Sequence, residues 1–340
     1  MRFESDNAAP AHPAVLAAIA EAGDAPGTYD NDRWSAALNE AFSQLFETAV
    51  DVVWATTGTA ANTLALAALC PAYGGVICHE EAHIANDECG APGFFTGGAQ
   101  LLALDGSGAK LDARAVRAFC DGRDVDQHTL PPRCLSLTNS TEYGLVYSAA
   151  EMAEFGAVAR AHGLRFHVDG ARFANAVAAS GASPADLSWR AGVDILSFGF
   201  SKNGGFVGEA MVLFDTALGE ELRYRRKRAG HLPAKGRLIA AQIAALLEGD
   251  LWLANARAAN AAATALAAAA PQRLLLPVEA NALFLRLAAG EAAALREQGF
   301  GFYDWDCDAT GGIYRLVTAW NTPAGDVAAM AGALRALENA

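Results

Sequence analysis

Hydrophobic residues between positions 50 and 215 gather in short runs that are separated by longer alanine-rich stretches. Several runs are apolar almost without interruption, which is typical of strands buried on both faces of a parallel sheet. The stretches between them have the composition of helices. This alternation predicts an α/β fold, with a mostly parallel sheet covered by helices. The predicted strands are Val50–Trp54, Gly75–His79, Arg133–Thr138, Leu164–Asp169, Asp194–Phe200 and Ala210–Phe214.

The pattern changes after Phe214. A basic run, Arg223–Arg228, precedes a long alanine-rich stretch that predicts one helix from about Arg237 to Ala270. Pro271 should end this helix, because proline cannot donate a backbone hydrogen bond and its ring clashes with the preceding turn.

The remaining residues predict a small α+β domain. We expect a large domain of residues 1–245, which includes the amino-terminal segment, and a small carboxy-terminal domain of residues 246–340. The small domain should contain two strands that flank a helix, at Asn281–Leu287, Tyr314–Trp320 and Ala292–Gln298 respectively.

Length and charge narrow the function. A chain of 340 residues with 53% hydrophobic content can bury the core of a large domain and a smaller one. Its formal net charge of −13 argues against a nucleic-acid partner or an anionic membrane surface, because phosphate contacts need a basic face. We therefore expect a small-molecule substrate.

The cysteines and the amino terminus favour a cytoplasmic protein. No C-x-x-C pair and no His/Cys cluster at zinc spacing occur, so the thiols are expected to be reduced and no metal site is predicted. The charged amino terminus lacks the apolar core of a signal peptide, and no apolar run resembles the roughly 18-residue span of a membrane helix. The six cysteines are Cys70, Cys78, Cys89, Cys120, Cys134 and Cys307.

A carboxylate follows one predicted strand, in the sequence His167–Arg172. Asp169 ends the apolar run, Gly170 turns the chain, and Arg172 lies about one turn further on. In open α/β sheets, ligands bind at the carboxyl ends of the strands, so Asp169 is expected to face a crevice. The alternative is a turn-forming aspartate without further function.

A lysine follows the next strand, where Phe200 is succeeded by Ser201, Lys202 and Asn203. By itself this pattern fits an exposed loop lysine. Lys202 lies roughly one βαβ unit after Asp169, however, so both side chains can emerge at the same edge of the sheet.

A third feature, Thr56–Asn62, connects a strand to a helix. Free amides at the start of a helix, together with threonine hydroxyls, can receive a phosphate at Thr57, Gly58 and Thr59. The stretch lacks both the Walker lysine and the G-x-G-x-x-G spacing, which disfavours a nucleotide and a dinucleotide-binding dehydrogenase. An ordinary helix cap is the alternative.

Together these features meet the needs of pyridoxal 5'-phosphate. The helix start receives the phosphate, Asp169 keeps the pyridine nitrogen protonated, and Lys202 supplies the amine for a Schiff base.

The sequence resembles the low-specificity L-threonine aldolases, within the β-eliminating lyases of the aspartate-aminotransferase fold. The resemblance runs nearly end to end and implies that fold, with pyridoxal phosphate as cofactor. The motifs that carry it are Phe3–Asn7, Tyr29–Asp32, Thr57–Asn62, Glu81–His83, His167–Arg172, Ser201–Gly204 and Arg315–Thr318.

The resemblance assigns cofactor contacts to three further residues. His83 would stack on the cofactor ring, and the Ser201 hydroxyl would serve the phosphate. Lys227 would lie near the phosphate, across a subunit interface. A polar loop histidine and a solvated basic helix face are the alternative readings of His83 and Lys227.

Substrate contacts also follow from the resemblance. Arg172 and Arg315 would clamp the amino-acid carboxylate, because a guanidinium grips a carboxylate through two hydrogen bonds. Ser5 would add a hydroxyl, and Tyr29 belongs to the same substrate-side set. His128 would lie near the β-hydroxyl, so that His83, His128 or a water between them is the candidate base.

Two stretches depart from the family pattern. Phe200 and Ser201 precede the lysine where relatives often carry a small residue and threonine. Asn139–Glu142 differs from the commoner Glu-Asn-Thr version, which puts contacts to the ring hydroxyl in doubt. Cys89 lies in a loop expected near the site.

The activity implied by the resemblance is retro-aldol cleavage of threonine, allo-threonine and related β-hydroxy amino acids to glycine and an aldehyde. A homo-oligomer, usually a tetramer built from two dimers with shared active sites, is implied as well. Two rivals stay open, because a fold does not decide the reaction. One is another reaction on the same cofactor, such as β-elimination, transamination or decarboxylation, and the other is a non-catalytic binding protein.

Overall fold

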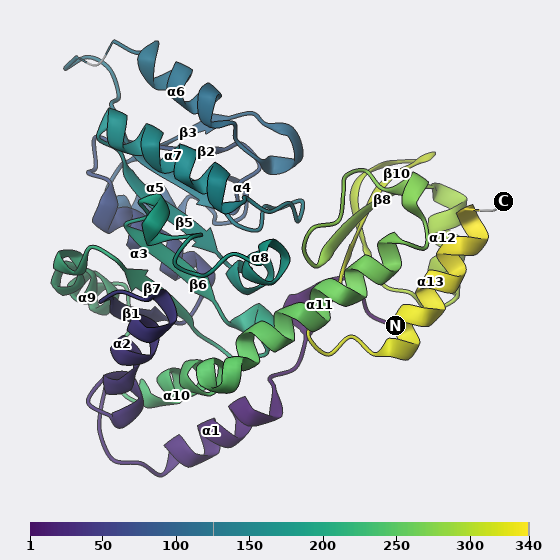
Figure 1. The fold of residues 1–340 in the computed structure, drawn as a ribbon, viewed down its shortest axis with the longest axis horizontal. Helices are drawn as coiled ribbons and strands as arrows, with labels where there is room; N and C mark the ends of the chain where they lie inside the picture. Colours follow the sequence, from purple (N-terminus) through teal and green to yellow (C-terminus); the bar gives the residue numbers. More distant parts are fainter. Residues whose placement is uncertain (125, 339–340) are drawn as a thin grey trace.

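A seven-stranded sheet forms the centre of the large domain in the computed structural model, which describes residues 1–124 and 126–338 (Figure 1). The strand order is β1-β7-β6-β5-β4-β2-β3. All pairs from β6 to β3 are parallel, and β7 is antiparallel to both of its neighbours. The strands are β1 (Asp51–Ala55), β2 (Gly75–His79), β3 (Gln100–Leu104), β4 (Pro132–Thr138), β5 (Arg165–Gly170), β6 (Ile195–Gly199) and β7 (Glu209–Leu213).

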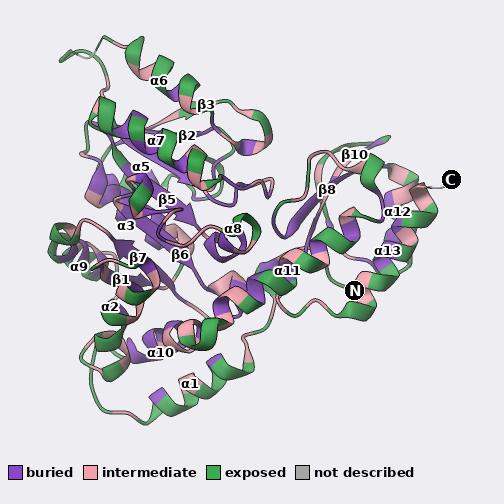
Figure 2. Cartoon of the chain, in the orientation of Figure 1, coloured by how far each residue is buried: buried purple, intermediate pink, exposed green. Residues whose placement is uncertain are grey.

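Helices cover both faces of this sheet, because alternate strand residues point to opposite sides. On β1, Val52 and Trp54 belong to one core, whereas Val53 belongs to the other. The first core packs against α2 (Arg33–Phe46), α7 (Ala149–His162), α8 (Phe173–Ser180) and α10 (Arg237–Leu247), and the second against α3 (Gly58–Leu69) and α9 (Gly219–Arg228). Figure 2 shows the sheet as the buried centre of the domain.

Local signals fix the ends of the covering helices. Ser148 and Glu151 form a capping box at the start of α7, and Gly163 ends this helix in the left-handed conformation, with φ of 63°. The remaining helices of the large domain are α1 (Pro13–Gly23), α4 (His83–Asn86), α5 (Ala91–Thr96) and α6 (Ala113–Asp121).

The predicted strands of the large sheet are confirmed to within one residue at each end, and β3 was missed. In the small domain, Asn281–Leu287 is confirmed to within one residue (Ala282–Ala288), whereas Tyr314–Trp320 lies three residues too far along the chain (Gly311–Val317), and the strand Tyr303–Asp308 was missed. The single helix expected from Arg237 to Ala270 is wrong. It is broken after Leu247, where Gly249 and Asp250 adopt φ values of 58° and 56°, and it resumes as α11 (Leu251–Ala267). Glycine has no Cβ to oppose this conformation, and aspartate tolerates it better than most residues.

One helical stretch of the described chain, Arg237–Ala267, has the length and apolar composition of a membrane span, with a mean hydropathy of 1.2. The sequence analysis found no such run. Packing explains its apolar side chains, since Ile243 and Trp252 lie in the core of the large domain and Leu266 lies in that of the small domain.

The small domain is a three-stranded antiparallel sheet of order β8-β10-β9, covered by two helices of its own and by the end of α11. The start of the chain also packs in the small domain, which was not expected. Phe3 lies in the core of this domain, and its backbone pairs with Gly301 and Val317. The amino-terminal segment, which was assigned to the large domain, therefore begins in the small one. The elements are β8 (Ala282–Ala288), α12 (Ala289–Glu297), β9 (Tyr303–Asp308), β10 (Gly311–Val317) and α13 (Ala324–Glu338).

Strand directions decide which residues meet at one edge of the large sheet. The carboxyl ends of β4, β5 and β6 share this edge because the three strands are parallel. β1 runs in the same direction as β6, since both are antiparallel to β7. The amino-terminal end of β7 therefore reaches the same edge.

Candidate active site

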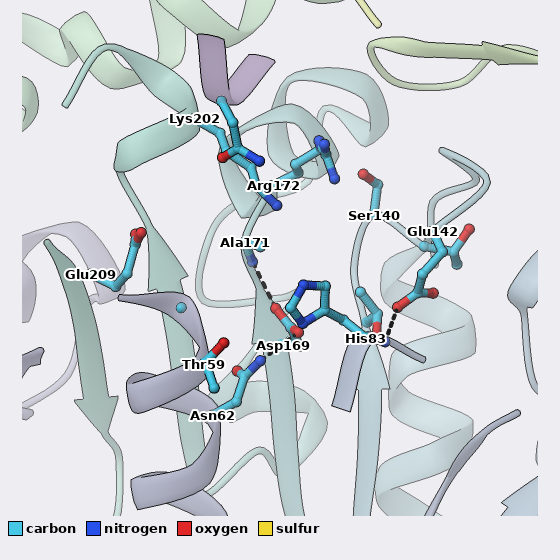
Figure 3. Close-up of a pocket in the computed structure, with 14 residues that line it drawn as sticks. Thr59, Asn62, His83, Ser140, Glu142, Asp169, Ala171, Arg172, Lys202 and Glu209 are labelled. Atoms are coloured by element: carbon cyan, nitrogen blue, oxygen red, sulfur yellow. Dashed lines mark hydrogen bonds between the residues drawn. The ribbon is translucent and has the colours of Figure 1, made fainter. Parts of the chain in front are cut away.

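A cavity of about 220 Å³ opens at this edge of the sheet. Figure 3 shows side chains that are far apart in the sequence, from Thr59 to Glu209, converging on it. Its lining combines a lysine, an arginine, three carboxyl groups and a histidine with small polar residues. They are Asn7, Gly58, Thr59, Asn62, His83, Thr138, Ser140, Thr141, Glu142, Asp169, Ala171, Arg172, Lys202 and Glu209.

Asp169 is the second-last residue of β5, at the strand end that the sequence predicted, and its carboxylate is fixed by two donors. The backbone N–H of Ala171 donates to Oδ1 over 3.0 Å, and Asn62 Nδ2 donates to Oδ2 over 2.7 Å (Figure 3). The side chain is 3% exposed. A carboxylate held in this way can face a protonated ring nitrogen without rotating away from it.

Lys202 lies in the short 3-10 turn η4 (Ser201–Asn203), directly after β6. The Arg172 guanidinium and burial together lower the pKa of its amine, which favours the neutral nucleophile that a Schiff base requires. Glu209, the first residue of β7, fixes the start of this turn, because the backbone N–H of Phe200 donates to Glu209 Oε2 over 2.5 Å. Burial raises the pKa of Glu209.

The start of α3 has the features that were predicted for an anion seat. Thr57 caps the helix, since its hydroxyl accepts the N–H of Ala60 over 3.1 Å. The first two residues of the helix, Gly58 and Thr59, line the cavity, and a Cβ added at Gly58 would meet nothing within 4 Å. Amides at a helix start and the positive end of its dipole suit a phosphate.

Arg172 lines the cavity, but its guanidinium is also hydrogen-bonded to the carboxylate of Asp6. Its Nε and Nη2 donate to Asp6 over 2.7 and 2.8 Å, and Asn281 also donates to Asp6 over 3.0 Å. Although burial opposes it, Arg172 holds the pKa of Asp6 below its usual value. Asp6 therefore takes one side of the guanidinium, and Nη1 is the amino group left for a substrate.

Arg315, on β10, is positioned by aromatic rings. Its guanidinium carbon lies 4.9 Å from the ring centroid of Trp305 and 5.3 Å from that of Tyr303. The indole N–H of Trp305 donates to Tyr143 over 3.0 Å. Nε of Arg315 is buried without a hydrogen-bond partner among the described residues. A partly buried guanidinium whose Nε lacks an acceptor among the described residues fits an anion such as a carboxylate.

His83 begins α4 and lies beside Asp169 in the cavity (Figure 3). Its Nδ1 lies 2.9 Å from Glu88 Oε1, and its backbone N–H donates to Glu142 Oε1 over 3.0 Å. The hydrogen bond to Glu88 raises the pKa of the imidazole. Burial raises the pKa of Glu142 to about 7.

Several predicted residues are not brought to this cavity. Ser5 caps the turn η1 (Asp6–Ala8), and its hydroxyl accepts the N–H of Asn7. Tyr29 and Lys227 lie together on the surface, with Nζ 5.0 Å from the ring centroid. His128 is exposed in a loop next to residue 125, which lies outside the described chain. These residues are absent from the cavity wall of their own chain, and so are the predicted site residues Thr57, Ser201 and Arg315.

Sequence reasoning missed several cavity residues. Asn62, which lines the cavity, and Asp6, which binds Arg172 without lining the cavity, both stand inside motifs that were quoted, without a role of their own. Glu209 opens an apolar strand, and a carboxylate there was an available signal. Glu142 and Ser140 belong to the divergent stretch that was left aside, and each carries a buried oxygen without a partner in the described residues.

Comparisons with known proteins agree with this geometry. The sequence profile of the family described as beta-eliminating lyase matches residues 2–289. The low specificity L-threonine aldolase of Pseudomonas aeruginosa is 44% identical, over 94% of this chain and 93% of that protein. A protein of the same name from a Pseudomonas species is 40% identical, over 100% of this chain and 98% of that protein.

Solved structures show the same fold. A threonine aldolase of Leishmania major matches with a TM-score of 0.93 and 27% identity over 99% of both chains. A serine palmitoyltransferase of S. paucimobilis with bound PLP matches with a TM-score of 0.72 and 17% identity, over 100% of this chain and 87% of that one. With its fold, the lysine and aspartate at one sheet edge and these relatives, the chain belongs to the beta-eliminating lyase family.

Proposed function

We propose that the protein binds pyridoxal phosphate at Lys202 and cleaves L-threonine and related β-hydroxy amino acids to glycine and an aldehyde. The observation that carries the proposal is the cavity in which Lys202, Asp169 and the start of α3 meet beside Arg172. The threonine aldolase that is 44% identical over nearly the whole chain supports the choice of reaction.

The cavity fits the cofactor group by group. Gly58 and Thr59 would hold the phosphate at the helix start, and Asp169 would keep the ring nitrogen protonated. Lys202 supplies the amine, whose pKa is lowered by Arg172 and by burial. When bound, the cofactor supplies an electron sink for the bond that breaks at the substrate Cα.

The arginines bind and orient the substrate. Arg315 Nε and Arg172 Nη1 offer donors to the carboxylate, and holding this group decides which bond at Cα stands perpendicular to the ring. His83 accepts the proton of the β-hydroxyl at Nε2, because Nδ1 is engaged with Glu88. Loss of this proton releases the aldehyde.

A product assay tests the proposal. The wild-type protein should convert threonine to acetaldehyde and glycine, and a panel of β-hydroxy amino acids would rank the substrates. We expect Lys202→Ala to lose nearly all turnover, because no other amine lines the cavity among the described residues. Pyruvate and ammonia from serine or cysteine, without cleavage of threonine, would instead identify a β-elimination, and normal turnover by the variant would refute the role of the lysine.

We also propose a cytoplasmic homo-oligomer that shares its active sites. Tyr29 and Lys227 support this sharing of active sites. The family resemblance assigns both residues to the active site, yet in their own chain they lie together on the surface, away from the cavity. All six cysteines are free, which agrees with a reducing compartment. Light scattering after size exclusion gives the oligomeric state, and a monomer with full activity would rule out sharing.

A further inference from the structure

Two buried side chains connect His83 to Asp169. The Nδ2 amide of Asn62 donates to Asp169 Oδ2 over 2.7 Å and to Glu88 Oε1 over 2.9 Å. The same Glu88 oxygen lies 2.9 Å from Nδ1 of His83. Asn62 and Glu88 are 2% and 4% exposed. One amide therefore joins Asp169, the carboxylate that would face a cofactor ring nitrogen, to Glu88, the carboxylate that contacts the histidine.

The burial of Glu88 calls for a partner. It lies between α4 and α5, and its side chain is fully shielded from solvent. A carboxylate in such a place is costly unless it is paired. Of its two hydrogen-bond partners only His83 can carry a positive charge, and Oε2 has no partner in the described part of the chain. His83 is thus the group that can offset the free-energy cost of burying this carboxylate.

The other edge of the imidazole is open. The His83 side chain is 40% exposed and lines the cavity, whereas the side chain of Glu88 is 0% exposed. Nε2 of His83 has no hydrogen-bond partner in residues 1–124 and 126–338. A carboxylate on Nδ1 fixes the ring orientation and leaves Nε2 as the acceptor in the neutral ring.

We propose that Glu88 is a positioning residue, whose carboxylate accepts the Nδ1–H of His83 and presents Nε2 to the cavity, while Asn62 ties this carboxylate to Asp169. The inference rests on the proposed function for its part in catalysis. Its structural content, the orientation and tautomer of His83, stands apart from turnover and can be measured separately.

The charges around His83 determine in which direction its pKa should change when Glu88 is replaced. Glu88 acts first through its hydrogen bond, and the carboxylate of Asp169 also favours the protonated imidazole, whereas burial and Lys202 oppose it. Glu142 faces the backbone of the same residue. In Glu88→Gln the hydrogen bond can remain but the negative charge is lost, so the pKa of His83 should fall.

The first experiment is an NMR titration of the histidine rings in the holoenzyme, with the His83 signal assigned by its absence in His83→Asn. We expect Glu88→Gln to lower the titration midpoint of His83 by about one pH unit, or tenfold in proton affinity. The acid limb of the kcat/KM profile should move with it. Glu88→Asp keeps the charge and should stay closer to the wild type.

Glu80→Gln is the matched control, because Glu80 is an exposed glutamate of the preceding loop and should leave the midpoint unchanged. An unchanged midpoint in Glu88→Gln would overturn the proposal whatever the activity. If that variant does not fold, nitrogen-15 shifts of the wild-type ring decide instead. A neutral His83 protonated at Nδ1 supports the proposal, and one protonated at Nε2 overturns it. Threonine cleavage by the wild type tests the proposed function independently.

Discussion

Glu142 makes the stability of this protein depend on pH in a predictable direction. Its Oε1 accepts the backbone N–H of His83 over 3.0 Å, and its Oε2 is buried without a partner among the described residues. Burial raises the pKa of this carboxyl from 4.5 to about 7. Glu142→Gln keeps the shape and the acceptor for His83 but removes the titration.

The size of this stability change follows from the pKa of Glu142 in the folded protein and its pKa in the unfolded chain. The folded protein binds the proton more tightly than the unfolded chain, so the contribution to stability is fully present below about pH 4.5 and is lost as the pH rises through about 7. One pH unit corresponds to about 1.4 kcal/mol, so the ionised carboxyl costs the folded state about 3 kcal/mol at pH 8. The glutamine variant should avoid this cost.

Urea unfolding at pH 5 and pH 8 tests this reasoning. We expect Glu142→Gln to lie within about 1 kcal/mol of the wild type at pH 5 and to exceed its free energy of unfolding by up to about 3 kcal/mol at pH 8. Glu154→Gln, on the exposed side of α7, is the control and should behave alike at both values. The same difference between variant and wild type at pH 5 and pH 8 would show that Glu142 does not titrate as argued.

Two further substitutions test the arginines. Arg315→Ala should raise KM for threonine by roughly 10- to 100-fold, the value of a hydrogen bond to a charged group, while cofactor affinity measured by absorbance stays the same; unchanged threonine kinetics would refute the carboxylate clamp. Asp6→Asn should lower the free energy of unfolding in urea by about 3 kcal/mol or more, because it removes the charge that compensates the buried guanidinium of Arg172; a neutral effect would mean that solvent replaces the pair.

The periodicity of apolar residues predicted most of the large domain because its strands are buried on both faces. β2, for example, was predicted with its observed bounds. β3 was missed since it lies at the sheet edge and is only partly buried. The break at Gly249 was missed because a single glycine in an alanine-rich stretch does not stand out, and its left-handed backbone is set by tertiary packing.

The site was predictable where the chain order itself brings residues to the sheet edge. Asp169 and Lys202 each follow a parallel strand, so their meeting follows from topology alone. Glu209 reaches the same edge from the opposite end of β7, and its place depends on an antiparallel pairing that periodicity does not predict. Glu88 depends on a loop path, which leaves no trace in residue spacing.

Asp6 shows why the amino-terminal segment matters to the site. Phe3 is anchored in the core of the small domain, and three residues later Asp6 holds Arg172 of the large domain. Asn281, at the start of the small-domain sheet, donates to the same carboxylate. Arg315 lies on that sheet as well. The segment thus links Arg172 to the small domain that carries Arg315, so a shift of the small domain would change the spacing of the two arginines that we propose to bind the substrate carboxylate.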